Sequence, residues 1–363
     1  MVKLSICFTV YNQLEMLKEK LDYIVGRQFE NVEIVISDDC STEDIKSLVD
    51  TYNDERIKYV RTPYNLGHDL NILYALEHCN SKYAFVFRTR DCIYIDNINE
   101  IISTITDNPD IGFYYFSAVD EDNVPRLTFE KKVYRNEERF DGYCVIPNHP
   151  SGNLYNLEYL DIDLLKKYIQ EHFDNVYGFC VHYLIKSWIS NRADILTSNI
   201  VGWIYSSTLK ANDVAVNSSK KKNNIYSFEY MIPRYKCEVD FELERNPKID
   251  MLKYLREIVN RNQIFMIYRS YNILKDKRYT DHYNCDGTRT NYLKNCLEFI
   301  KLTNSYIMRL NTKEKKIIKR TMYKNTLMLL TIYRIMGIFR NKLIDSCIYN
   351  WYVKYQAERK RKK

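Results

Sequence analysis

The stretch LSICFTVYN at residues 4–12 decides how this chain folds. It joins a short apolar run to a polar end that contains Thr, Tyr and Asn. The same form returns as VEIVISDDCST at residues 32–42 and as YAFVFRTRDCIY at residues 83–94. Short apolar runs rich in β-branched and aromatic residues are typical of buried strands. We therefore predict three strands, each followed by polar side chains: Leu4–Phe8, Val32–Ile36 and Tyr83–Phe87.

Helical patterns separate these predicted strands and cover Leu14–Gln28, Thr42–Tyr52 and Asp69–Cys79. The second begins in the stretch 41–44, where hydroxyls can cap a helix and acids fill its first turn. Alternating strands and helices predict an α/β fold with a buried parallel sheet. Ligands of such sheets bind at the carboxyl ends of the strands, so we expect the three polar clusters to form one site.

The length of 363 residues is too great for one small domain. We predict an α/β domain over residues 1–205 and a helical, basic region over residues 206–363, with helices at Lys253–Ser270 and Asn291–Met308. The ten cysteines include no Cys-x-x-Cys pair, which indicates reduced thiols. No signal-peptide pattern follows Met1, so we expect a cytoplasmic protein.

Positive charge gathers at the end of the chain. Residues 311–363 hold fifteen Lys and Arg against three acids. Their apolar run is interrupted by Arg334 and is too short to span a bilayer. Two interpretations stay open, a helix on the anionic inner face of the cell membrane or a helix packed on the first domain with a solvated basic edge. The rest of the chain is net acidic, so no nucleic-acid partner is expected.

Four motifs together resemble the family 2 glycosyltransferases, whose Rossmann-like nucleotide-sugar-binding domain is called the GT-A fold. The resemblance covers about residues 3 to 205 and depends on the order and spacing of the motifs. They are Thr9-Val10-Tyr11-Asn12, Asp38-Asp39-Cys40-Ser41, Asn65-Leu66-Gly67 with Asn71, and Thr89-Arg90-Asp91.

The resemblance implies that these motifs bind the nucleotide of a nucleotide-sugar donor. Tyr11 would stack on the base, and Asp39 would accept a hydrogen bond from its imide N–H. An ordinary turn tyrosine at residue 11, and capping or turn roles for Asn65 and Asn71, are alternatives from the residues alone. The predicted donor-binding residues are Thr9, Tyr11, Asn12, Asp38, Asp39, Asn65, Asn71, Arg88 and Arg90.

The last motif departs from the family pattern, in which paired acids bind a divalent cation that bridges the two phosphates. Here Asp91 keeps one carboxylate and Arg90 replaces its acidic neighbour. One hypothesis is that Asp91 still binds Mn²⁺ or Mg²⁺, and this is the one we favour at this point. Another is that Arg88 or Arg90 neutralises the diphosphate directly, since a guanidinium suits phosphate oxygens. A third is that one arginine pairs with Asp38 or Asp39.

The general base of the family is commonly an Asp in a Glu-Asp pair before the last strand. The matching positions here, 179 and 180, are Phe and Cys. His182 is the nearest group with a suitable pKa and is the first candidate, with a buried structural histidine as the alternative. Asp174 is the second candidate. His149, in the loop at 148–153, is expected to be a surface histidine.

The sequence therefore predicts an inverting glycosyltransferase of the hexosyltransferase type. It would move a sugar from a nucleotide-diphosphate donor, expected to be a UDP-sugar, to a glycan or lipid-linked glycan in bacterial surface polysaccharide synthesis. The competing class is a catalytically degenerate GT-A-fold binding or scaffold protein.

Overall fold

The computed structural model describes residues 3–27, 29–147, 149–172, 181–206, 228–246, 250–261, 263 and 289–338. The chain divides into two compact units. One comprises residues 1–225 with 236–248, and the other comprises residues 226–235 with 249–363. The predicted boundary after residue 205 stays a prediction. The stretch 216–224, which is rich in Ser, Lys and Asn and for which the sequence predicts a loop, lies outside the described residues.

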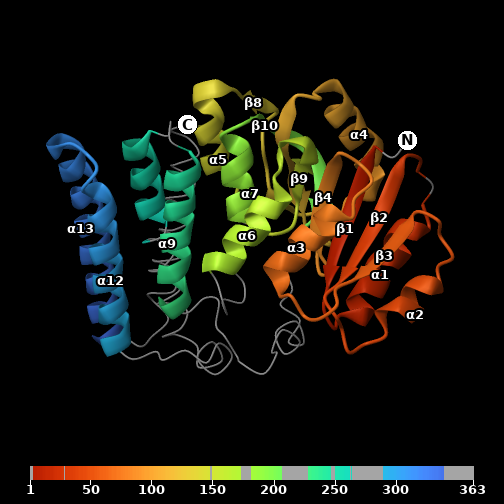
Figure 1. The fold of residues 1–363 in the computed structure, drawn as a ribbon, viewed down its shortest axis with the longest axis horizontal. Coiled ribbons are helices and arrows are strands. Elements are labelled where there is room, and N and C mark those ends of the chain that lie inside the picture. The colour runs from red at the N-terminus through yellow and green to blue at the C-terminus, as the bar shows by residue number, and fades with distance from the viewer. Residues whose placement is uncertain are drawn as a thin grey trace. The chain divides into compact units, whose positions relative to one another are not determined.

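The described part of the first unit is built on a ten-stranded sheet in the order β3-β2-β1-β4-β9-β6-β10-β5, with β7 paired to β6 and β8 to β10 (Figure 1). β1 pairs in parallel with both β2 and β4, and β9 runs antiparallel between β4 and β6. The strands are β1 Leu4–Val10, β2 Val32–Asp38, β3 Ile57–Arg61, β4 Tyr83–Arg88, β5 Cys92–Ile93, β6 Ile111–Val119, β7 Pro125–Leu127, β8 Lys132–Tyr134, β9 Asn153–Asn156 and β10 Asp194–Ile204.

The three predicted strands are confirmed as parallel neighbours, and each runs further than its apolar residues. Phe8 lies opposite Ile36 on one side and Phe87 on the other. Pairing then continues through Val10 and Asp38 because backbone groups bond whatever the side chain is. Polar side chains therefore stand on the last residues of the strands as well as beyond them.

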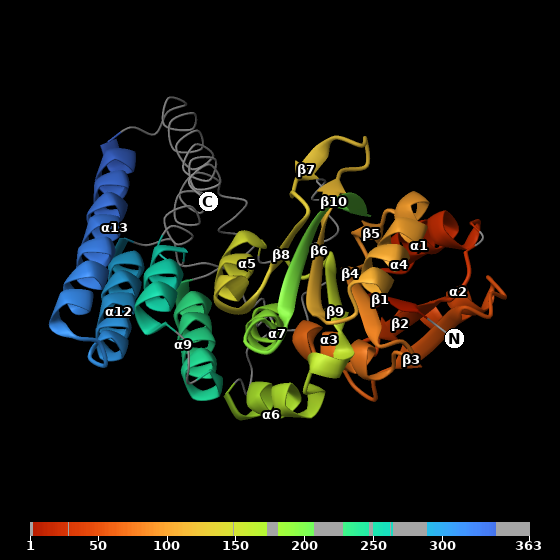
Figure 2. The same cartoon turned by 90° about the horizontal axis from the view of Figure 1, so that it is seen from above.

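Helices cover both faces of this sheet. Figure 2 shows α1 and α4 on one face, with α3, α6 and α7 on the other. α3 packs against β1 and β2 and also contacts α6 and α7. The helices are α1 Leu14–Val25, α2 Ile45–Asp50, α3 His68–Glu77, α4 Ile98–Asp107, α5 Arg139–Val145, α6 Ile162–His172 and α7 Val181–Ser190.

The predicted start of the second helix is wrong by three residues. α2 begins at Ile45, and its N-cap is Asp44, whose carboxylate accepts a hydrogen bond from Ser47 N at 3.0 Å. Residues 41–43 form a turn before the helix because side chains of the neighbouring loop bind their backbone, as shown below. Asp44 is thus a capping residue, although the sequence pattern placed it inside the first turn.

In the second unit the helices are α12 Arg289–Ile307 and α13 Thr312–Ile338, and residues 251–261 are also helical. α12 confirms the predicted helix at Asn291–Met308. Tyr235 stacks on Phe299 with ring centroids 4.5 Å apart, and Gln263 donates to Met322 O. No helix among the described residues is long and apolar enough to cross a membrane.

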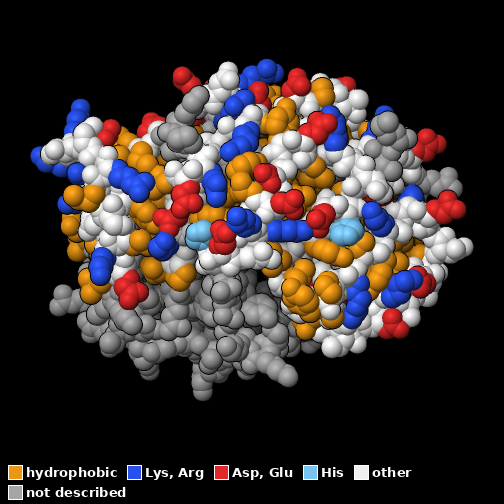
Figure 3. Space-filling view, in the orientation of Figure 1, with side chains coloured by type: hydrophobic (Ala, Val, Ile, Leu, Met, Phe, Trp, Pro, Cys, Tyr) orange, Lys and Arg blue, Asp and Glu red, His pale blue; other side chains and the backbone are white. Residues whose placement is uncertain are grey.

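Charged side chains of both signs are interspersed over the face shown in Figure 3. In α1 and α2 some charged side chains form exposed pairs four residues apart, Lys18 with Asp22 and Lys46 with Asp50. Such exposed pairs add little stability. The stability of the first unit therefore depends on its buried groups.

Gly152 shows how tightly the sheet packs around the start of β9. Its φ of 80° lies in the left-handed region, and a Cβ at this residue would overlap the indole ring of Trp203. Trp203 is itself fully buried. Glycine is therefore required here by both conformation and space.

We expect Gly152→Ala to lower the free energy of unfolding by about 2 kcal/mol or more, because backbone strain and overpacking add. Urea unfolding followed by tryptophan fluorescence measures the change. Gly26→Ala is the matched control, since Gly26 has a φ of −64° and its new Cβ would make an ordinary contact with Asp22 O at 3.7 Å. An equal effect of the two substitutions would contradict this account.

A second buried group makes the first unit sensitive to pH. Glu242, in α9 Phe228–Arg245, accepts hydrogen bonds from Ser187, Asn191 and Asn246. Burial raises the pKa of Glu242 from 4.5 to about 7, although these three donors act to lower it. The folded protein therefore binds this proton more tightly than the unfolded chain does.

The contribution of Glu242 to stability is thus fully present below about pH 4.5 and is lost as the pH rises through about 7. The shift corresponds to about 3 kcal/mol. We compare the free energies of unfolding of Glu242→Gln and of wild type at about pH 5 and about pH 8. The stability of the variant relative to wild type should be higher at pH 8 than at pH 5, by an amount of that order. Parallel pH profiles for the two proteins would contradict this assignment.

Candidate functional site

The parallel strands β1, β2 and β4 end at one edge of the sheet, and this edge carries the sequence-predicted donor residues. Thr9 is buried in β1, and Tyr11 follows the strand and is partly exposed. Asp38 ends β2, and Arg88 ends β4. The register places Thr9 beside Arg88 and Val10 beside Asp38. The prediction that the three polar clusters meet at one edge of the sheet is confirmed.

Asn12 ties the end of β1 to the turn before α2. Its side-chain oxygen accepts hydrogen bonds from Thr42 N at 2.7 Å, from Thr42 Oγ1 at 3.0 Å and from Glu43 N at 3.3 Å. Its own N–H donates to Ser41 Oγ at 2.9 Å. Asn12 has a φ of 48°, which asparagine tolerates better than most residues. Tyr11 is therefore held between the end of β1 on one side and the bonds of Asn12 on the other.

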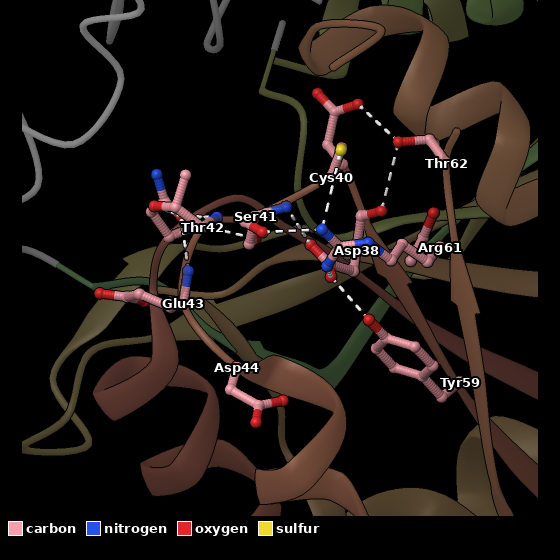
Figure 4. Close-up of polar contacts among 12 residues, drawn as sticks. Asp38, Cys40, Ser41, Thr42, Glu43, Asp44, Tyr59, Arg61 and Thr62 are labelled. Atoms are coloured by element: carbon pink, nitrogen blue, oxygen red, sulfur yellow. Dashed lines mark hydrogen bonds and ion pairs between the residues drawn. The ribbon is translucent and has the colours of Figure 1, made fainter. Parts of the chain in front are cut away.

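Asp38 is occupied by its own surroundings (Figure 4). Its Oδ2 accepts from Tyr59 OH at 2.6 Å and from Arg61 Nη1 at 2.5 Å, and its Oδ1 accepts from Ser41 N at 2.9 Å. Arg61 also donates to Ser41 O at 2.8 Å. The arginine that pairs with this carboxylate thus comes from β3, and the hypothesis that Arg88 or Arg90 does so gains no support from these contacts. Asp38 orders the turn 38–41.

Asp39 holds the loop that leads into α3. It accepts hydrogen bonds from Leu66 N at 2.6 Å, from Gly67 N at 2.9 Å and from Thr62 Oγ1 at 3.2 Å. Burial raises the pKa of Asp39, while these donors act to lower it. A carboxylate offers about four acceptor positions, so room for one further hydrogen bond is left.

Asn65 makes the turn contact that the alternative interpretation requires, whereas Asn71 makes a structural contact that is neither a cap nor a turn. Asn65 Oδ1 accepts from Gly67 N at 3.1 Å. Asn71 is buried, accepts from Ser37 Oγ at 2.6 Å and donates to Ser37 O at 3.1 Å. Asn71 therefore joins α3 to β2, and its donor-binding role stays a prediction, as does that of Asn65.

Asp91 lies fully buried directly after β4. Its Oδ2 accepts from Ser151 Oγ at 2.6 Å and from Arg88 Nη2 at 3.2 Å, and its Oδ1 accepts from Ser206 N at 3.0 Å. Arg90 Nε is 3.9 Å from Oδ2. Burial acts to raise the pKa of Asp91, but the arginines beside it hold the pKa below its usual value.

The two serines that bind Asp91 were missed by sequence reasoning. They are 60 and 115 residues away from it, and no local pattern marks them. Gly152, next to Ser151, is only a weak signal for this contact. A glycine in a loop predicts a turn, here one with a left-handed residue, and does not predict which group the neighbouring serine binds.

His149 is not the surface histidine that its loop suggested. Its ring stacks on Trp203 with centroids 5.4 Å apart, and its Nε2 lies 2.9 Å from Arg88 Nη2. Desolvation by these neighbours, followed by the charge of Arg88, lowers the pKa of His149 to about 3. The imidazole is therefore neutral at physiological pH and belongs to the surroundings of Arg88.

His182, the first candidate for the general base, lies in the first turn of α7 and is 4% exposed. Neither ring nitrogen has a hydrogen-bond partner within the described part of the chain. Burial lowers the pKa of His182 well below 6.5, and His68, His149 and Arg88 are near enough to add to this effect. The second candidate, Asp174, lies outside the described residues.

The surroundings of Asp91 do not form a typical divalent-cation site. Among the described residues, no group of three His, Cys, Asp or Glu side chains is placed to hold a metal ion. The carboxylate oxygens of Asp91 already accept three hydrogen bonds, and two guanidinium groups lie beside them. The role of Asp91 as a metal ligand stays a prediction that this donor set does not favour.

Comparison with known proteins agrees with the motifs at the sheet edge. Residues 5–163 match the family model described as Glycosyl transferase family 2. The chain is 32% identical over 110 residues to the abequosyltransferase RfbV of Salmonella typhimurium, covering 29% of this chain and 33% of that one. It is 28% identical over 106 residues to the GalNAc(5)-diNAcBac-PP-undecaprenol beta-1,3-glucosyltransferase of Campylobacter jejuni, covering 28% and 32%. The match thus spans about a third of each relative.

Among solved structures, that of TarS from S. aureus superposes with a TM-score of 0.51 at 16% identity, covering 91% of this chain and 55% of TarS. At this identity the likeness concerns the fold, which is of the GT-A type. The similarity to glycosyltransferase family 2 comes from the family model alone and concerns residues 5–163 of this chain.

Proposed function

We propose that this protein is an inverting glycosyltransferase that moves a sugar from a nucleotide-diphosphate donor to a glycan acceptor. The observation that carries this proposal is the meeting of four motifs at one sheet edge, within residues that match the family model. The same edge presents an exposed aromatic ring, a carboxylate with acceptor capacity left and two arginines. These are suited to a base, its imide group and a diphosphate.

The donor that fits best is a UDP-sugar. Tyr11 follows β1 and is partly exposed, so its ring is available to stack on a pyrimidine. Asp39 has one acceptor position left for the imide N–H of uracil. Cytosine has no such imide, which is the physical basis for a preference among pyrimidine nucleotides.

The chemistry would be a single displacement. The acceptor oxygen forms a bond to the anomeric carbon as the bond from that carbon to the diphosphate oxygen breaks, and the acceptor proton passes to a general base. His182 is our first candidate because it is neutral, buried and near Arg88 and has ring nitrogens without partners among the described residues. Asp174 is the second.

The acceptor is proposed to be a lipid-linked glycan in the synthesis of a surface polysaccharide. Support comes from the Campylobacter relative, a glucosyltransferase named for an undecaprenol-linked glycan. The fifteen basic residues of 311–363 suit an anionic membrane surface. On this proposal the protein is peripheral at the inner face of the cell membrane.

Nucleotide preference tests the donor assignment. We expect UDP to raise the melting temperature of the purified chain more than CDP at equal concentration, because cytosine lacks the imide N–H, and GDP and dTDP are measured beside them. A ligand at 100 times its Kd stabilises by about 2.7 kcal/mol. Tyr11→Ala should weaken UDP binding about tenfold through lost stacking. Calorimetric titration measures the affinity.

The matched control is Tyr323→Ala, because Tyr323 is a 54% exposed tyrosine of the second unit. It should leave UDP affinity unchanged. If none of the four nucleotides binds wild type, the transferase proposal fails and a degenerate binding or scaffold protein becomes the better explanation.

The role of His182 is tested by turnover. We expect His182→Gln to lower kcat by at least about 100-fold, the usual size of a general-base contribution, with UDP affinity unchanged. The readout is UDP released from UDP-glucose, UDP-galactose and UDP-N-acetylglucosamine.

His78→Gln is the control for this measurement, because His78 caps the far end of α3 and bonds to Tyr74 O. Full turnover of His182→Gln would exclude His182 as the base, and Asp174→Asn would then be measured in the same assay.

A further inference from the structure

The surroundings of Arg88 and Arg90 hold hydrogen-bond donors that no described residue uses. The Nε atoms of both arginines are buried and have no hydrogen-bond partner among the residues that the structure describes. The side chains are 24% and 21% exposed. We call these two arginines the arginine pair. Buried donors without partners are costly, so such a pair points to a ligand rich in acceptor oxygens.

The arginine pair is held in place by its neighbours. Arg88 Nη2 bonds to Asp91 at 3.2 Å and lies 2.9 Å from His149 Nε2. The backbone N–H of Arg88 also donates a hydrogen bond to Ser151 Oγ at 3.0 Å. One carboxylate thus faces two guanidinium groups, and with neutral His149 the cluster keeps a net positive charge.

Asp91 has little capacity left for a cation. Both of its oxygens accept hydrogen bonds, from Ser151, Ser206 and Arg88. A divalent ion next to this carboxylate would displace some of these donors and would stand close to two positive charges. Coulomb repulsion between the ion and the two guanidinium groups is strong in a partly buried site. The residues here therefore do not fit the metal that the family resemblance implies.

We propose that the arginine pair takes the place of the divalent cation, so that the diphosphate of the donor binds directly to Arg88 and Arg90 without Mn²⁺ or Mg²⁺. This inference rests on the proposed function and names how its site holds the donor. Guanidinium groups bind phosphate oxygens through two parallel N–H groups, and they stay charged throughout the physiological pH range. Asp91 would then act as a positioning residue for the pair.

Direct binding also supplies what the displacement needs. Negative charge develops on the diphosphate oxygen as its bond to the anomeric carbon breaks, and fixed positive charge beside that oxygen stabilises the transition state. Arg88 is already ordered by Asp91 and Ser151, and Arg90 Nε lies 3.9 Å from Asp91 Oδ2. Little reorganisation is therefore needed at the moment of transfer.

The test is calorimetric titration of UDP into the full chain, once in EDTA and once in excess Mn²⁺. We expect the two affinities to agree within about twofold. Arg90→Gln should weaken UDP binding at least tenfold in both buffers, and Arg90→Asp, which places two adjacent carboxylates at residues 90 and 91, should bind UDP only when Mn²⁺ is present. Melting temperatures show whether the variants are folded.

Lys167→Gln is the control for the loss of one positive charge, because Lys167 is 76% exposed on α6; its UDP affinity should equal that of wild type. Binding of UDP to wild type that disappears in EDTA would overturn this inference and leave the transferase proposal intact. Absence of UDP binding in both buffers would overturn the two together. The comparison of UDP affinity for wild type in the two buffers tests the inference even if an arginine variant does not fold.

Discussion

The parallel pairing of β1 with β2 and with β4 is the constraint on which the rest of this structure depends. It aligns the apolar residues of three strands, so that Phe8 has Ile36 and Phe87 as neighbours, and it brings three strand ends to one edge. A shift of register by one residue would turn each buried side chain to the opposite face. Because the core fixes the register, the polar residues next to the core are placed as a group, and a binding site follows from packing.

The sequence predicted this arrangement well where the signal was local. Apolar strand segments, the helices between them and the position of Asp38, Asp39 and Arg88 at strand ends can be read from consecutive residues. The contacts that complete the site could not be predicted, since Ser151 and Ser206 reach Asp91 from 60 and 115 residues away. The predicted start of α2 was also wrong, because a side chain from another loop binds the backbone there. Asn12 binds the backbone of residues 42 and 43, and α2 begins only after them.

The electrostatics of the edge could not be read from the charges in the sequence alone. Two aspartates stand in succession after the second strand, but Asp38 is compensated by Arg61, and Asp39 is bound by backbone N–H groups. Asp91 stands beside two guanidinium groups. The histidines nearby are held neutral, chiefly by burial. The charge that this edge offers to a ligand is therefore set by which charged groups are already paired. Arg88 and Arg90 each keep an N–H donor without a hydrogen-bond partner among the described residues.

The bonds that Asn12 makes to residues 41–43 have a consequence for recognition. They are made within the chain itself, so the loop that carries Tyr11 is held by its own residues. A nucleotide would then meet a preorganised surface and would bind with a small loss of chain entropy. A surface fixed in this way discriminates by shape and hydrogen bonding, because it cannot adapt to a base of another size.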